Sequence, residues 1–193
     1  MLVTDDALVM GRDLVALVKA AEQGGITSVQ LRLKSASAAE LAELGRSLLQ
    51  SVHIPLFMND RVDVALAIGA QGVHLGPDDM PVAMARRISP AGFVIGASVG
   101  VEDELVNGSE ADYWGVGPWA ATATKHNAGA ALGPAGFARI VAQAGGRPCI
   151  AIGGLRPGDT AAAIAAGAAG VAVVSGILGA GDVASAARRY RAL

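Results

Sequence analysis

The chain has 193 residues, a mean hydropathy of +0.46 and a formal net charge of −2 at pH 7. The small charge excludes a global basic field that would attract nucleic acid or an anionic membrane. Gly, Asp and Arg interrupt the apolar runs, and none reaches the ~20 residues of a membrane-spanning helix. No charged segment leads into a long apolar run near the start, so we expect no secretory signal and a cytoplasmic location.

Eight short runs rich in β-branched residues alternate with helical patterns along the chain. The runs are apolar at nearly every position, as strands buried on both faces are. They cover residues 2–4, 28–31, 56–58, 72–75, 94–97, 113–116, 149–152 and 170–174. Apolar residues recur at helical spacing over 14–21 and 41–49, a helix opens at Pro157 and ends before Gly167, and Arg188, Arg189 and Arg191 are expected in a last helix.

Strands that alternate with helices form either a closed (β/α)8 barrel or a doubly wound open sheet. The count of eight favours the barrel, and so do the polar or glycine residues that end or follow nearly every strand. In a barrel these strand ends converge on one mouth, whereas an open sheet would spread them along an edge. We therefore predict an α/β fold, a single TIM-barrel domain over residues 1–193. Its loops should be tight, because such barrels typically need roughly 250 residues.

Polar side chains alternate at the end of the second run, where Gln30, Arg32 and Lys34 fall on one face of an extended chain. Long polar side chains in a barrel mouth need an anion or a hydrogen-bonding ring as partner. Arg and Lys both suit phosphate. The alternative is a layer of salt bridges inside the barrel.

Carboxylates follow the third and fourth runs, as Asn59-Asp60 and Asp78-Asp79. Two carboxylates from adjacent strand ends are able to share Mg²⁺, which usually also takes substrate phosphates and water as ligands. The alternative is that these residues cap the helices that follow them.

Two further features indicate anion binding. The long loop after the sixth run contains Gly117-Pro118 and 119–125, whose two hydroxyls and one ammonium would form a clamp. Gly153-Gly154 and Val174-Ser175-Gly176 end the seventh and eighth runs, where barrels commonly bind phosphate through backbone N–H groups.

Other reactive side chains have plainer interpretations. Cys149, the one cysteine, excludes an intramolecular disulfide and is expected to be a buried thiol. His74 is expected to be a core histidine with a hydrogen-bond partner. No Ser/His/Asp order or zinc-ligand spacing stands out.

Read together, these segments resemble the thiamine-phosphate synthase family over essentially the whole chain. The resemblance rests on six motifs in the same order and spacing. They are Val29-Gln30-Leu31-Arg32-Leu33-Lys34, Asn59-Asp60-Arg61-Val62-Asp63-Val64-Ala65, Gly72-Val73-His74-Leu75-Gly76-Pro77-Asp78-Asp79, Gly115-Val116-Gly117-Pro118, Thr122-Ala123-Thr124-Lys125 and Ala151-Ile152-Gly153-Gly154.

The resemblance implies a transferase that condenses hydroxymethylpyrimidine diphosphate with hydroxyethylthiazole phosphate and releases pyrophosphate. By analogy, the diphosphate side would comprise Gln30, Arg32, Lys34, Asn59, Ser98 and Lys125. Mg²⁺ would be bound by Asp60 and Asp79. The thiazole phosphate would contact Thr122, Thr124, Gly154, Val174 and Ser175.

The implied chemistry needs no dedicated general base. The family's mechanism is dissociative: diphosphate departs first, and the thiazole nitrogen then attacks the pyrimidine methylene cation. Arg32, Lys125 and Mg²⁺ would stabilise charge on the leaving group, and Ser98 is counted with the two cations among the catalytic residues. The expected partners are therefore small phosphorylated substrates, and a homo-oligomer is left open.

Two alternatives remain. A related thiazole tautomerase generally carries histidine where this chain has Pro118, and it does not need the two carboxylates. A non-catalytic protein that binds thiazole phosphate or thiamine phosphate is favoured by Val99-Gly100-Val101, which stands where the synthase family usually carries three polar residues after Ser98.

Overall fold

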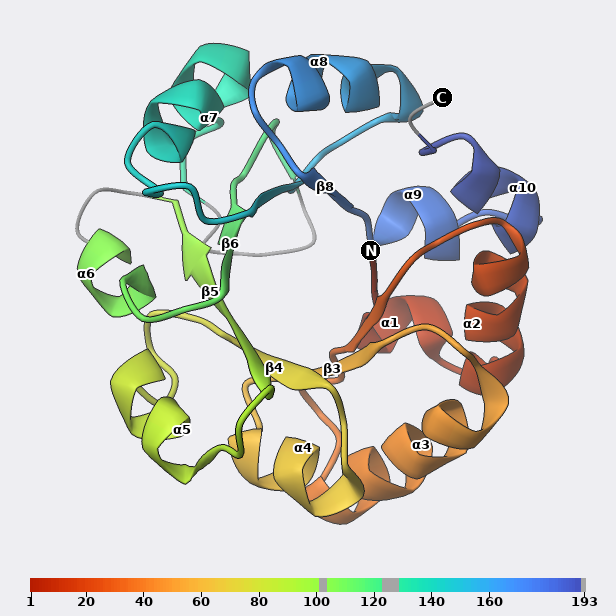
Figure 1. Cartoon of the computed structure of the whole chain (residues 1–193). Helices are drawn as coiled ribbons and strands as arrows, with labels where there is room; N and C mark the ends of the chain where they lie inside the picture. Colours follow the sequence, from red (N-terminus) through yellow and green to blue (C-terminus); the bar gives the residue numbers. More distant parts are fainter. Residues whose placement is uncertain (101–103, 123–128, 192–193) are drawn as a thin grey trace. The chain divides into compact units, whose positions relative to one another are not determined.

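The computed structural model describes residues 1–100, 104–122 and 129–191 (Figure 1). Its eight strands lie in one sheet in the order β1 to β8. Strands β1 to β4 pair in parallel with one another in sequence, and so do β5 to β8. A doubly wound sheet reverses its order at a switch point, so this sequential order identifies the (β/α)8 barrel class. The predicted fold class is confirmed.

Strand positions follow the predicted apolar runs closely. The strands are β1 (Leu2–Val3), β2 (Val29–Leu31), β3 (Leu56–Asn59), β4 (Gly72–Leu75), β5 (Val94–Val99), β6 (Tyr113–Val116), β7 (Cys149–Ile152) and β8 (Gly170–Ala172). Most strand residues are buried, as expected for strands covered on both faces. Five ends differ from the prediction by one or two residues: β1 ends at Val3, β2 begins at Val29, β3 continues to Asn59, β5 continues to Val99, and β8 ends at Ala172.

The chain forms two compact units, and the first comprises Met1–His74 with Val174–Arg191. Its helices are α1 (Asp6–Val9), α2 (Leu14–Gln23), α3 (Ala38–Ser51), α4 (Val62–Ile68), α9 (Ser175–Leu178) and α10 (Val183–Arg188). Helix α3 begins at a capping box between Ser37 and Glu40, and it buries Leu41 and Leu48. Helices α2 and α10 pack side by side (Figure 1). The predicted last helix ends at Arg188, so Arg189 is its C-cap and Arg191 lies beyond it.

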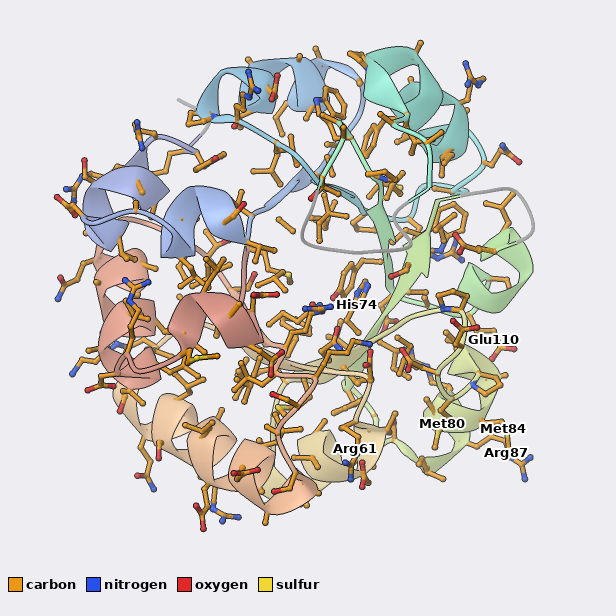
Figure 2. All side chains as sticks on the ribbon, turned by 180° about the vertical axis from the view of Figure 1, so that it is seen from behind. Arg61, His74, Met80, Met84, Arg87 and Glu110 are labelled. Atoms are coloured by element: carbon orange, nitrogen blue, oxygen red, sulfur yellow. The ribbon has the colours of Figure 1, made fainter. Side chains whose placement is uncertain are left out.

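The second unit comprises Leu75–Val173. Its helices are α5 (Val82–Ile88), α6 (Leu105–Gly108), α7 (Gly133–Val141) and α8 (Thr160–Ala165), which follows the 3₁₀ turn η2 (Pro157–Asp159). Trp119 packs edge-on against Phe137 of α7 with ring centroids 5.6 Å apart. Met84 and Arg87 project from α5 (Figure 2). The prediction of a single domain over residues 1–193 stays a prediction.

No helix among the described residues is long and apolar enough to cross a membrane.

Candidate active site

The first unit carries the predicted cations just beyond the end of β2. Gln30 lies within β2 and is buried, but the strand ends at Leu31, so alternation along a strand does not orient Arg32 and Lys34. Arg32 lies in the following segment, and Lys34 begins a turn. The Nη1 atom of Arg32 lies 3.3 Å from Oδ2 of Asp5, and Nζ of Lys34 lies 2.8 Å from Oδ2 of Asp60.

Residues that follow β1 hold this segment in place. The hydroxyl of Thr4 donates to the carbonyl of Arg32 at 3.0 Å and accepts from the N–H of Arg32 at 2.7 Å. The carboxylate of Asp6 accepts the N–H groups of Lys34 and Ser35 at 2.8 and 3.0 Å. Thr4 and Asp5 are among the polar residues that follow the predicted strands, and no motif in the sequence points to Asp6. Their position after β1 was the available signal, but their partners depend on the parallel register of β1 and β2.

The turn after β3 brings a predicted metal ligand into contact with a predicted phosphate ligand. Asn59 is the last residue of β3, and Asp60 follows it with a left-handed φ of 64°. The N–H of Asp60 donates to the carbonyl of His74 on β4 at 2.9 Å. The N-cap of α4 is Arg61, and the helix has no side-chain cap. Capping by Asn59 or Asp60 is therefore wrong, and Asp60 pairs with Lys34 instead.

A second ion pair lies beside this turn. Arg61 donates to both carboxylate oxygens of Asp63, at 2.8 and 2.6 Å. The hydrogen bond from Arg61 lowers the pKa of Asp63 despite the opposing effect of burial. Because Arg61 is paired with Asp63, it does not compete with Lys34 for Asp60.

In the second unit, Asp79 closes the turn after β4. Its Oδ2 atom accepts the N–H of Gly76 at 2.6 Å. Helix α5 takes Pro81 as its N-cap residue rather than Asp78 or Asp79. Asp60 and Asp79 thus lie in different units, and each occupies a turn after a strand.

The end of β5 explains the departure from the family pattern. Ser98 and Val99 are both strand residues, and Val99 is buried. A Cβ atom on Gly100 would lie 2.6 Å from the carbonyl oxygen of Gly117, and the N–H of Gly100 donates to Glu104. Val99 is therefore a core residue here, and position 100 has no room for a side chain. Val101 lies outside the described residues.

The loop after β6 is anchored on the glycine pair that follows β7. The N–H groups of Trp119 and Ala120 donate to the carbonyls of Ile152 and Gly153 at 2.8 and 2.9 Å. Gly154 has a φ of 69°, and a Cβ atom on it would lie 2.7 Å from the carbonyl oxygens of both Ala120 and Ala121. The pair therefore accommodates the loop backbone, which is a steric reason for glycine that no local sequence pattern reveals.

The remaining predicted residues fall in three places. Thr122 lies in the loop after β6, at the end of the described segment 104–122. Val174 is the N-cap of α9, and Ser175 is its first residue. Thr124 and Lys125 lie outside the described residues, as does His126.

The interpretation of Cys149 as a buried thiol is confirmed, whereas His74 on β4 is only partly buried. Cys149 is buried in β7, and burial raises the pKa of its thiol despite the charge of Arg147. The side chain of His53 is exposed, and the backbone N–H of His53 donates to Oε1 of Glu22 at 2.8 Å. Within the described segments, no group of three or more His, Cys, Asp or Glu residues is arranged to bind a metal.

Comparison with known proteins identifies the family of this chain. The family model described as thiamine monophosphate synthase matches residues 1–177. The chain belongs to this family. Thiamine-phosphate synthases of Methanospirillum hungatei and Azorhizobium caulinodans are 42% and 47% identical to it. These matches cover 98% and 100% of this chain and 94% and 92% of the relatives.

Solved structures agree with the family assignment. The thiamine phosphate pyrophosphorylase from Pyrococcus furiosus superposes with a TM-score of 0.86 at 36% identity, covering 98% of this chain and 92% of the other. A 3-hexulose-6-phosphate synthase is also similar, with a TM-score of 0.71 at 17% identity, covering 98% and 97% of the two chains. The latter likeness concerns the fold alone.

Proposed function

We propose that this chain is a thiamine-phosphate synthase. It condenses hydroxymethylpyrimidine diphosphate with hydroxyethylthiazole phosphate to give thiamine phosphate and pyrophosphate. Family membership over residues 1–177 supports this assignment. The observation that carries it is the group at the ends of β2 and β3. There the guanidinium of Arg32 lies 3.3 Å from Asp5, and the ammonium of Lys34 lies 2.8 Å from the carboxylate of Asp60.

The diphosphate is bound by the side chains that follow β2 and β3. Arg32 offers a planar fork that suits two phosphate oxygens, and Lys34 offers a compact positive charge. The carboxylates of Asp5 and Asp60 orient the two cations through contacts of 3.3 and 2.8 Å. Gln30 and Asn59 add neutral hydrogen-bond donors, and Ser98 with Lys125 completes this side of the site.

Mg²⁺ fits the donor set of the turns that follow β3 and β4. Carboxylate oxygens are the protein ligands that Mg²⁺ prefers, together with substrate phosphates and water. Among the described residues, Asp60 uses only Oδ2, to contact Lys34, and Oδ1 is left for an ion. Asp60 and Asp79 would hold the ion, which when bound supplies charge stabilisation to the diphosphate.

The thiazole phosphate is bound by hydroxyls and backbone N–H groups. Thr122 and Thr124 supply the hydroxyls. Gly154 and the Val174-Ser175 segment supply backbone close to the ends of β7 and β8, where barrels of this class commonly bind phosphate.

The protein's own residues stabilise the leaving group and position the nucleophile. The bond between the pyrimidine methylene carbon and the diphosphate oxygen breaks, and its electron pair leaves with the diphosphate. Arg32 and Lys125 stabilise that negative charge, and Ser98 donates a hydrogen bond to it. The thiazole nitrogen then forms the carbon–nitrogen bond, so positioning replaces general base catalysis.

Pyrophosphate release from the two substrates tests the assignment. Purified protein with both substrates and Mg²⁺ should form thiamine phosphate and pyrophosphate in equal amounts. Omitting either substrate, or chelating the metal, should abolish both products. Binding of thiamine phosphate without turnover would overturn the proposal in favour of a binding protein. Conversion of a thiazole tautomer without pyrophosphate release would favour an isomerase.

A further inference from the structure

Three consecutive residues after β1 are tied to the segment that carries Arg32 and Lys34. They are Thr4, Asp5 and Asp6, here called the β1 anchor. The regular ladder between β1 and β2 ends with the pairing of Val3 and Gln30. Beyond that point, the segment that carries both cations is held by side chains of the β1 anchor.

The hydroxyl of Thr4 takes the place of the next main-chain hydrogen bonds between β1 and β2. Its side chain is completely buried, and its hydroxyl both donates to the carbonyl and accepts from the N–H of Arg32, at 3.0 and 2.7 Å. A buried hydroxyl that makes two bonds to one residue fixes the backbone of that residue, because breaking either bond leaves a buried polar group unpaired. The backbone of Arg32 is therefore set by a side chain of another strand end.

Asp5 orients the guanidinium. Its Oδ2 atom lies 3.3 Å from Nη1 of Arg32, and the two side chains are only 16% and 21% exposed. Its other oxygen accepts the N–H of Ala7 at 3.2 Å at the start of α1. The distance to Arg32 exceeds the ~2.7–2.9 Å of a tight charge-assisted bond, so the carboxylate guides the guanidinium without saturating it.

Asp6 ties down the turn at Lys34. One oxygen accepts the N–H of Lys34 at 2.8 Å, and the other accepts both the N–H and the hydroxyl of Ser35. Burial would raise the pKa of Asp6, but hydrogen bonds from Ser35 and Lys34 lower it, so the carboxylate is charged at neutral pH. The ammonium of the same Lys34 reaches Asp60 at 2.8 Å.

We infer that the β1 anchor positions Arg32 and Lys34 for the diphosphate substrate, without touching that substrate itself. This inference rests on the proposed function. Thr4, Asp5 and Asp6 are positioning residues that act through the two cations. The negative charges of Asp5 and Asp6 lie near the proposed diphosphate site, so electrostatics alone would oppose substrate binding, whereas positioning favours it.

The direction in which substrate binding changes on mutation distinguishes positioning of the cations from simple electrostatic repulsion of the substrate. In Asp5→Asn and Asp6→Asn, a negative charge is removed, and simple electrostatics predicts tighter binding of an anion. Positioning predicts the opposite: roughly 10- to 100-fold lower kcat/KM, because small misplacements of a binding group are costly. The KM for the pyrimidine diphosphate should rise, and the KM for the thiazole phosphate should stay unchanged.

Thr4 offers an isosteric pair of variants. Thr4→Val removes both hydrogen bonds and keeps the shape, and Thr4→Ser restores the hydroxyl. The valine variant should bind Mg²⁺–pyrophosphate about tenfold more weakly in calorimetry, whereas the serine variant should recover most of the affinity. In an Arg32→Gln background, Thr4→Val should add little, because the residue through which it acts is already lost.

Asp13→Asn is the matched control. Asp13 belongs to the same unit and caps α2 by accepting the N–H of Ala16 at 3.0 Å. Among the described residues, it forms no hydrogen bond or ion pair with Arg32 or Lys34. It carries the same charge change and should leave both KM values unchanged. Thermal unfolding of every variant identifies any that fail to fold, and if Thr4→Val does so, Asp5→Asn and Asp6→Asn decide the question.

Two failures remain distinguishable. If wild-type protein releases no pyrophosphate from the two substrates, the proposed function is wrong. If the wild type is active but the folded Asp5→Asn and Asp6→Asn variants bind pyrophosphate equally well or more tightly, the positioning role is wrong. Equal increases in the KM of both substrates would also overturn it, because they indicate a general structural effect.

Discussion

Asp60→Asn separates a role in metal binding from a role in folding. Asp60 has a left-handed φ of 64°, which Asn tolerates well, so the turn is expected to keep its backbone. The variant loses an ion pair to Lys34, whose side chain is 55% exposed. Such an exposed pair contributes about 0–1 kcal/mol, which corresponds to a change in Tm of at most about 2–4 °C.

The effect on activity should be much larger than the effect on stability. Replacing a charged metal ligand by a neutral amide removes charge stabilisation from the departing diphosphate. A loss of about 3 kcal/mol in transition-state stabilisation corresponds to roughly 100-fold in kcat/KM. We expect at least this loss in pyrophosphate release, together with a higher Mg²⁺ concentration for half-maximal rate. Both are measured by a coupled pyrophosphate assay over a Mg²⁺ titration, with thermal unfolding in parallel.

Asp63→Asn is the control for this experiment. Asp63 lies three residues away, is 66% exposed and forms a comparable ion pair with Arg61. It loses the same charge but has no place in the proposed metal site, so its Mg²⁺ dependence should match that of the wild type. An Asp60→Asn variant with wild-type rate and Mg²⁺ dependence would refute the assignment of Asp60 as a metal ligand.

Three further predictions concern other parts of the chain. Gly154→Ala should destabilise the fold by at least about 1–2 kcal/mol in urea unfolding, because φ is 69° and the new Cβ would lie 2.7 Å from two carbonyl oxygens; unchanged stability would contradict this packing. Asp6→Asn should flatten the acid limb of the stability curve. The pKa of Asp6 is lowered from 3.8, so its contribution is present above that pH and is lost as pH falls further. Cys149 should react with a thiol reagent only on unfolding, because burial raises its pKa; rapid labelling of native protein would argue against a buried thiol.

Most of the strand positions were predictable because a strand buried on both faces leaves a continuous apolar run. The runs at Gly72–Leu75, Tyr113–Val116 and Cys149–Ile152 match their strands residue for residue. The ends of the strands were less predictable than their centres. Val99 continues β5 because it pairs with Val116, and no local pattern marks that pairing.

The candidate site was predictable in residue type and only partly in geometry. The sequence places Arg32, Lys34 and Asp60 just after strands, and the structure brings Lys34 and Asp60 into contact. It also shows that Asn59 and Asp60 do not cap α4 through their side chains. The assignments of substrate and metal ligands stay predictions, including those of Thr124 and Lys125 outside the described segments.

The alternation of strands and helices, the polar strand ends and the family resemblance all follow from local sequence pattern and spacing. The contacts between residues at the ends of different strands depend on the fold. Thr4 and Arg32 are 28 residues apart, as are Asp6 and Lys34, and they meet because β1 and β2 pair in parallel register. Such partners are set by hydrogen bonding between strands, which no single stretch of sequence records.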